Sequence, residues 1–97
     1  PQLAKQADAL HPAVLRSIAQ TVQAAQKAGK WVGVCGNLAS DPLGAEILTG
    51  LGVTELSVSI PSVATIKAHM RTVALTAMQE KAERALQCRS AREVREL

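Results

Sequence analysis

The chain has 97 residues, a net charge of +3 and a hydrophobic content of 47%, and Trp31 is its only aromatic residue. This length suits one domain or less, and no apolar run approaches the roughly 18 residues of a membrane span. Lys and Arg are scattered and no row of aromatic rings could stack on bases, so we expect no nucleic-acid partner and no membrane insertion. The N-terminus lacks a secretory-signal pattern and an initiator Met, which suggests an excised piece of a longer protein.

The cysteine content points to a reducing compartment. Cys35 and Cys88 are the two cysteines, and neither belongs to a CxxC pair. Disulfide-rich scaffolds and structural zinc sites need more cysteines than these two, so a cytoplasmic location is the simplest expectation.

The tail of the chain alternates in charge, which predicts solvated helix faces with pairs such as Glu80 with Arg84.

The first half of the chain predicts a helix followed by a strand. Apolar residues recur with helical spacing between Pro12 and Lys27. Pro12 suits the first helical turn and Gly29 suits the position just past the end. The Val-rich "WVGVC" at 31–35 is typical of parallel strands that are covered on both faces.

A second helix and a second strand follow. Ser40 or Asp41 can cap a helix that Pro42 opens and that Gly50 or Gly52 ends. The "TELSVS" at 54–59 predicts a strand with the apolar residues Leu56 and Val58 on one face.

Three further helices are expected to complete the chain. The first begins near Pro61 and continues to residue 74, and the second is amphipathic and covers Leu75 to Leu86. Ser90 and Glu93 form a capping box for a short last helix.

The order of these elements defines the fold class. A helix between two strands makes a parallel βαβ unit, and two parallel strands cannot enclose a core, because parallel sheets are covered on both faces. The sequence therefore predicts an α/β fold that is the closing portion of a larger sheet or barrel, so residues 1–97 are not a complete domain. Free strand edges should make such a piece pair, so we expect a homodimer or higher oligomer.

Cys35 is the principal candidate for a functional residue. It falls at the carboxyl end of the first strand, which faces the ligand in α/β folds, and Gly36 would let a substrate approach the backbone. A cysteine there can be a nucleophile, a metal ligand or a general acid, although a nucleophile normally needs a His partner, and neither His11 nor His69 is obviously placed for this. The structural alternative is a small buried packing residue.

Structural roles account for the remaining candidates. Ser57, Ser59 and Asp41 suit helix caps, for which Ser and Asp are preferred residues. We expect the others to be a turn or cap residue (His11), a surface histidine (His69), an incidental thiol (Cys88) and packing residues (Met70, Met78).

Four stretches resemble a known family in their order and spacing: "LHPAVLRSI", "GKWVGVCGNLASDPL", "LGVTELSVS" and "IPSVATIK". The family is enzyme I of the phosphoenolpyruvate-dependent sugar phosphotransferase system, and the resemblance covers its C-terminal part from about Leu10 to the end. Much of the family has Glu after "CG" and Gly before the Asp, where this chain has Asn37 and Ser40. "CGNLASDPL" is more similar to the fructose-linked multiphosphoryl transfer proteins, which fuse enzyme I to carrier and sugar-specific domains.

The resemblance implies a (β/α)8 TIM barrel that binds phosphoenolpyruvate at its C-terminal mouth, with this chain as the last two strands and their helices. The parent enzyme would transfer the phosphoryl group from phosphoenolpyruvate to a protein histidine, with Mg²⁺, and then to the carrier HPr for sugar uptake. Cys35 matches the family's active-site cysteine, which protonates C3 of enolpyruvate to give pyruvate. An ordinary thiol has a pKa of ~8.5 and is therefore available as a proton donor at neutral pH.

The resemblance also limits what this chain can do. The family's Mg²⁺ ligands, phosphate-binding arginines and phosphorylated histidine lie upstream, so we expect no metal ligand here, with Asp41 and Glu46 included, and no phosphoryl transfer by this chain alone. One alternative is the terminal barrel piece of a pyruvate phosphate dikinase or phosphoenolpyruvate synthase, which also has a "CG" cysteine. The other is a non-catalytic helical association module in which Cys35 is a packing residue.

Overall fold

The computed structural model describes residues 8–97, so most of the stretch compared with secretory signals lies outside the described part. The predicted mixed α/β order is confirmed, with one addition: the short helix α3 was not predicted. Helices predominate, and none of those within residues 8–97 combines the length and the apolar character needed to cross a membrane. The elements are α2 (Pro12–Lys27), β1 (Gly33–Cys35), α3 (Asn37–Ser40), α4 (Pro42–Leu51), β2 (Glu55–Ser57), α5 (Ile60–Met70), α6 (Leu75–Gln87) and α7 (Ala91–Arg95).

Local capping residues set the ends of α2 and α4, as predicted. The Nδ1 atom of His11 accepts a hydrogen bond from the backbone N–H of Ala13 at 3.1 Å, directly before Pro12. Asp41 caps α4 in the same way, and α4 ends at Gly52, whose φ of 105° is in the left-handed region that favours glycine. These short-range interactions satisfy N–H groups that have no partner within the helix.

Helix α5 begins where predicted, with Pro61 in its first turn, but its end differs from the prediction. The helix ends at Met70 instead of residue 74, because Thr72 donates from both its N–H and its Oγ1 to the carbonyl of His69 and so closes a turn. Ser59 occupies the N-cap position but makes no capping hydrogen bond with its side chain, and Ser57 belongs to β2. The predicted cap position is therefore confirmed for Ser59, although its side chain makes no capping hydrogen bond, and is wrong for Ser57.

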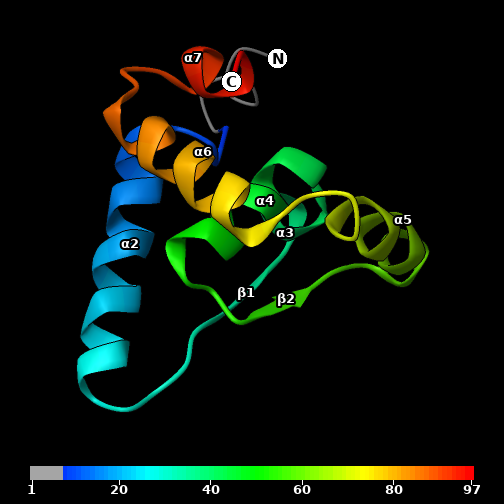
Figure 1. Ribbon diagram of the computed structural model, residues 1–97, viewed down its shortest axis with the longest axis horizontal. Helices are drawn as coiled ribbons and strands as arrows, with labels where there is room; N and C mark the ends of the chain where they lie inside the picture. Colours follow the sequence, from blue (N-terminus) through cyan, green and yellow to red (C-terminus); the bar gives the residue numbers. More distant parts are fainter. Residues whose placement is uncertain (1–7) are drawn as a thin grey trace.

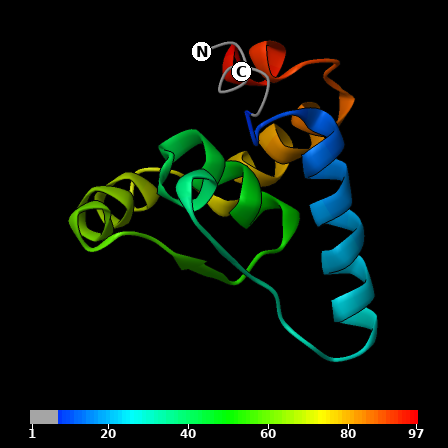
Figure 2. The same ribbon diagram turned by 180° about the vertical axis from the view of Figure 1, so that it is seen from behind.

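The two strands form the predicted parallel sheet, with Gly33 opposite Glu55, Val34 opposite Leu56 and Cys35 opposite Ser57. Val34 and Leu56 pack against buried residues of the helices, whereas the other four residues are exposed. Both views place the helices of the described chain above or beside the strands (Figures 1 and 2). The sheet therefore has one covered face and one open face.

Helix α4 is the centre of the packing, between the sheet and α6 (Figure 1). Ile47 contributes to a cluster with α6 and α7, and Leu48 contributes to a cluster with α2 and the strands. The crossing with α6 is close at Gly50, where an added β-carbon would lie 2.2 Å from the carbonyl oxygen of Met78. The apolar faces of α4 thus anchor both the strands and the C-terminal helices.

Candidate functional site

The chain turns sharply directly after Cys35. Gly36 has φ 98° and ψ −163°, a backbone conformation that L residues rarely adopt. Its carbonyl accepts hydrogen bonds from the N–H of Ser40 at 3.3 Å and from Ser40 Oγ at 3.4 Å, which closes the single turn of α3. Cys35 is exposed at the end of β1. The structural alternative of a buried packing cysteine is therefore wrong for the chain as described.

The open face of the sheet presents three polar side chains, Cys35, Glu55 and Ser57. Both histidines are engaged elsewhere, because His11 caps α2 and His69 contacts Glu46. A His-activated nucleophile is thus disfavoured. Cys35 therefore presents an exposed thiol at the carboxyl end of a parallel strand.

Arg95 joins three segments near this turn. Its Nε and Nη2 donate to the two carboxylate oxygens of Asp8 at 2.8 and 3.0 Å, and its Nη1 donates to Asp41 Oδ2 at 3.0 Å. The hydrogen bond from Arg95 holds the pKa of Asp8 below its ordinary value. The sequence predicted Asp41 as a cap, which is confirmed, but gave no indication of its pairing with Arg95.

A second charged cluster was missed: His69, predicted as a surface histidine, keeps 33% exposure but also contacts a buried carboxylate. The buried carboxylate of Glu46, on α4, lies 2.6 Å from Nε2 of His69 on α5 and accepts a hydrogen bond from Lys81 Nζ on α6 at 2.9 Å. Burial raises the pKa of Glu46, but the hydrogen bonds from Lys81 and His69 outweigh this effect and hold it below its ordinary value. A lone Glu within the apolar run 43–48 was the available indication, since a buried carboxylate needs partners.

These charged groups do not fit a magnesium site. Within residues 8–97, no three side chains of His, Cys, Asp or Glu gather around a point that could hold a metal ion. The second oxygen of Glu46 is already occupied by the Lys81 ammonium, and Mg²⁺ requires oxygen ligands.

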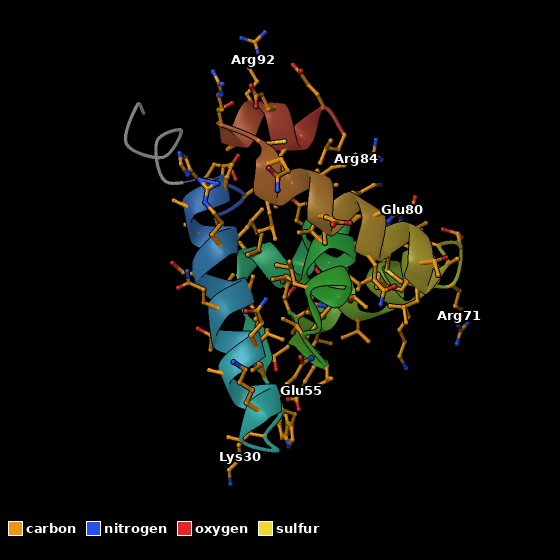
Figure 3. The ribbon with its side chains drawn as sticks, turned by 60° about the vertical axis from the view of Figure 1, so that its left-hand side comes forward. Lys30, Glu55, Arg71, Glu80, Arg84 and Arg92 are labelled. Carbon is orange, nitrogen blue, oxygen red and sulfur yellow. The ribbon has the colours of Figure 1, made fainter. Side chains whose placement is uncertain are left out.

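The predicted Glu80–Arg84 pair on α6 is also wrong. Glu80 and Arg84 extend outward from the helix (Figure 3), and they do not appear among the ion pairs of the described part of the chain. The i, i+4 pair that forms instead joins Arg92 and Glu96 at 3.5 Å on the surface of α7.

The chain is similar in sequence to a known family and to several known proteins. Residues 1–75 match the family "PEP-utilising enzyme, PEP-binding domain". The chain is 61% identical over its full length to a multiphosphoryl transfer protein of Rhodobacter capsulatus, and 37% identical over its full length to multiphosphoryl transfer protein 1 of Escherichia coli K12. Over 90% of its length it is 38% identical to the phosphoenolpyruvate-protein phosphotransferase of Staphylococcus carnosus.

The chain therefore belongs to the family of PEP-utilising enzymes and matches their PEP-binding domain. Its similarity to multiphosphoryl transfer proteins and to a phosphoenolpyruvate-protein phosphotransferase confirms the resemblance seen in the "CGNLASDPL" stretch. The chain spans 12% of the length of the two multiphosphoryl transfer proteins and 15% of the phosphotransferase.

Proposed function

We propose that residues 1–97 are the C-terminal piece of a phosphoenolpyruvate–protein phosphotransferase and contribute the last two strands and helices of a (β/α)8 barrel. The observation that carries the proposal is the position of Cys35, exposed at the carboxyl end of a parallel strand and followed by Gly36 in a left-handed conformation. The open sheet face and the strand edges that residues 8–97 leave unpaired support it, because parallel strands are normally covered on both sides.

In this proposal Cys35 is the proton donor of the parent enzyme. Removal of the phosphoryl group from phosphoenolpyruvate leaves an enolate, and the S–H proton of Cys35 moves to its C3 atom as the new C–H bond of pyruvate forms. The thiolate that remains takes a proton from solvent before the next turnover. Gly36 carries no side chain, so the backbone next to the thiol stays open to a small, flat anion.

The rest of the parent would supply the other components of the reaction. These are the Mg²⁺ ligands, the phosphorylated histidine and the surface that binds an HPr-type carrier. We therefore expect this chain to be inactive by itself, since positioning and charge stabilisation drive phosphoryl transfer. Its cytoplasmic location and its self-association stay predictions.

The proposal is tested with Cys35→Ala in the full-length protein. Exchange of the pyruvate methyl protons with deuterium is followed by NMR with Mg²⁺ and the phosphorylated enzyme. We expect exchange to fall by at least about 100-fold, the usual contribution of a positioned general acid, whereas Cys88→Ala, at the other cysteine of the chain, should leave it unchanged. Unchanged exchange in a folded Cys35→Ala protein would show that another group delivers the proton.

The same preparation separates the alternatives. A dikinase or synthase parent would pass the phosphoryl group between phosphoenolpyruvate and a nucleotide, whereas the proposed parent passes it to a carrier protein. A purely associating module would show no dependence of proton exchange on Cys35. The names of the relatives favour the phosphotransferase.

A further inference from the structure

The side chain of Arg95 connects the C-terminal helix α7 to the start of α4. Arg95 uses three N–H groups, two on Asp8 and one on Asp41, at 2.8 to 3.0 Å. Such a planar, bidentate arrangement is the strong form of an ion pair. Val94, next to Arg95, is fully buried, so the helix that carries the guanidinium is itself anchored in the core.

Asp41 divides its two oxygens between α7 and α4. Oδ2 accepts from Arg95, and Oδ1 accepts the N–H of Leu43 at 3.0 Å and that of Gly44 at 3.5 Å. Asp41 therefore both caps α4 and binds Arg95 of α7. A shift of Arg95 would be transmitted directly to the start of α4.

The start of α4 in turn holds the turn that follows Cys35. The Asp41 N–H donates to the Leu38 carbonyl at 3.4 Å. The Leu38 carbonyl packs closely on Gly44: a β-carbon added to Gly44 would lie 2.2 Å from the Leu38 carbonyl oxygen. Helix α3 is thus pressed against α4, and its first residue comes directly after Gly36.

We propose that Arg95 is a positioning residue for the Cys35 turn: through Asp41 it holds residues 36–41 against α4, and so fixes where the thiol lies relative to the substrate. The proposal rests on the proposed function for its catalytic consequence, but not for the ordering of the turn. Arg95 would not touch the substrate itself.

The test compares Arg95→Gln with Arg92→Gln in the full-length protein. Arg92 lies on the same helix and, among the described residues, pairs with Glu96 alone; its side chain is 90% exposed and extends away from the body (Figure 3). Amide hydrogen exchange of peptides that cover residues 36–41 should become about tenfold faster in Arg95→Gln and remain unchanged in Arg92→Gln. In Arg95→Gln, the kcat for exchange of the pyruvate methyl protons should fall about tenfold relative to the unsubstituted protein, with KM within about twofold. A misplaced thiol slows the proton transfer without weakening substrate binding.

Asp41→Asn keeps the test decisive if Arg95→Gln loosens the whole chain. Asn is as good a cap as Asp but removes the charge that Arg95 binds, so residues 36–41 alone should exchange faster. Unchanged amide exchange at 36–41 in Asp41→Asn would overturn the proposal. A kcat of Arg95→Gln equal to that of Arg92→Gln would overturn it as well. If Cys35→Ala left proton exchange intact, the proposed function would fail, and amide exchange at 36–41 would then decide this proposal by itself.

Discussion

Cys35 and Ser57 are register partners in the parallel sheet, and both lie on the face that the helices of the described chain leave open. Neighbouring strands are about 4.8 Å apart, so a ligand that reaches the thiol also meets the Ser57 hydroxyl. Cys88 is in a different setting: it is half-buried at the end of α6 and donates from Sγ to the carbonyl of Arg84 at 3.4 Å.

This contrast predicts selective protection of Cys35 by phosphoenolpyruvate. In the full-length protein, iodoacetamide should alkylate Cys35 more slowly when phosphoenolpyruvate and Mg²⁺ are present, because under the proposed function the ligand covers the open face. The rate at Cys88 should not change, and it serves as the internal control. Both rates are read from the same digest by peptide mass spectrometry. Equal protection of the two cysteines would place the ligand elsewhere.

Gly50 should not tolerate a methyl group. A β-carbon at this position would lie 2.2 Å from the Met78 carbonyl oxygen, a backbone atom of α6 that cannot move without shifting the helix. We expect Gly50→Ala to lower the free energy of unfolding of the PEP-binding domain by about 3 kcal/mol, as measured by urea denaturation.

Gly29→Ala is the matched control for Gly50→Ala. Gly29 has φ 69°, but nothing lies within 4 Å of an added β-carbon. Its cost should therefore be limited to backbone strain of about 1 kcal/mol. Equal losses for the two variants would mean that the contact between α4 and α6 is not tight.

Glu46→Gln should destabilise the packing of α4, α5 and α6. The amide retains the shape of the side chain but leaves the Lys81 ammonium without its counter-charge. Removing one partner from a fully buried pair costs about 3–5 kcal/mol. Lys81 and His69 keep 24% and 33% exposure, so we expect about 2 kcal/mol here, measured by urea denaturation. Glu96→Gln removes an exposed carboxylate from its pair with Arg92 and should change the free energy by less than about 0.5 kcal/mol.

The same carboxylates predict acid sensitivity. The folded-state pKa values of Glu46 and Asp8 lie below their ordinary values, which are about 4 in an unfolded chain. Groups of this kind stabilise the fold fully above the unfolded pKa, and the stabilisation is lost as the pH falls through the folded pKa. The free energy of unfolding should therefore be steady above about pH 5 and decline below about pH 4. In Glu46→Gln the decline should be shallower, and a decline of equal slope would contradict the role of Glu46.

Most helix ends could be predicted from the sequence, because the residues that set them act over one turn. His11 with Pro12, and Asp41 with Pro42, cap their helices where expected. Ser90 accepts the N–H of Glu93, as a capping box requires, but the Glu93 carboxylate returns to the N–H of Arg89. The helix α3 escaped prediction because its four residues are too few to show a period.

By itself, the sequence determined the order of helices and strands, the parallel βαβ unit and the place of Cys35 at the end of β1, since capping, alternation and helical spacing are local properties. Tertiary structure alone decided which distant groups meet: Glu46 with His69 and Lys81, Arg95 with Asp8 and Asp41, and Gly50 with Met78. These contacts depend on how α4 crosses its neighbours. The crossing is set by the combined burial of many apolar side chains, which no short stretch of sequence encodes.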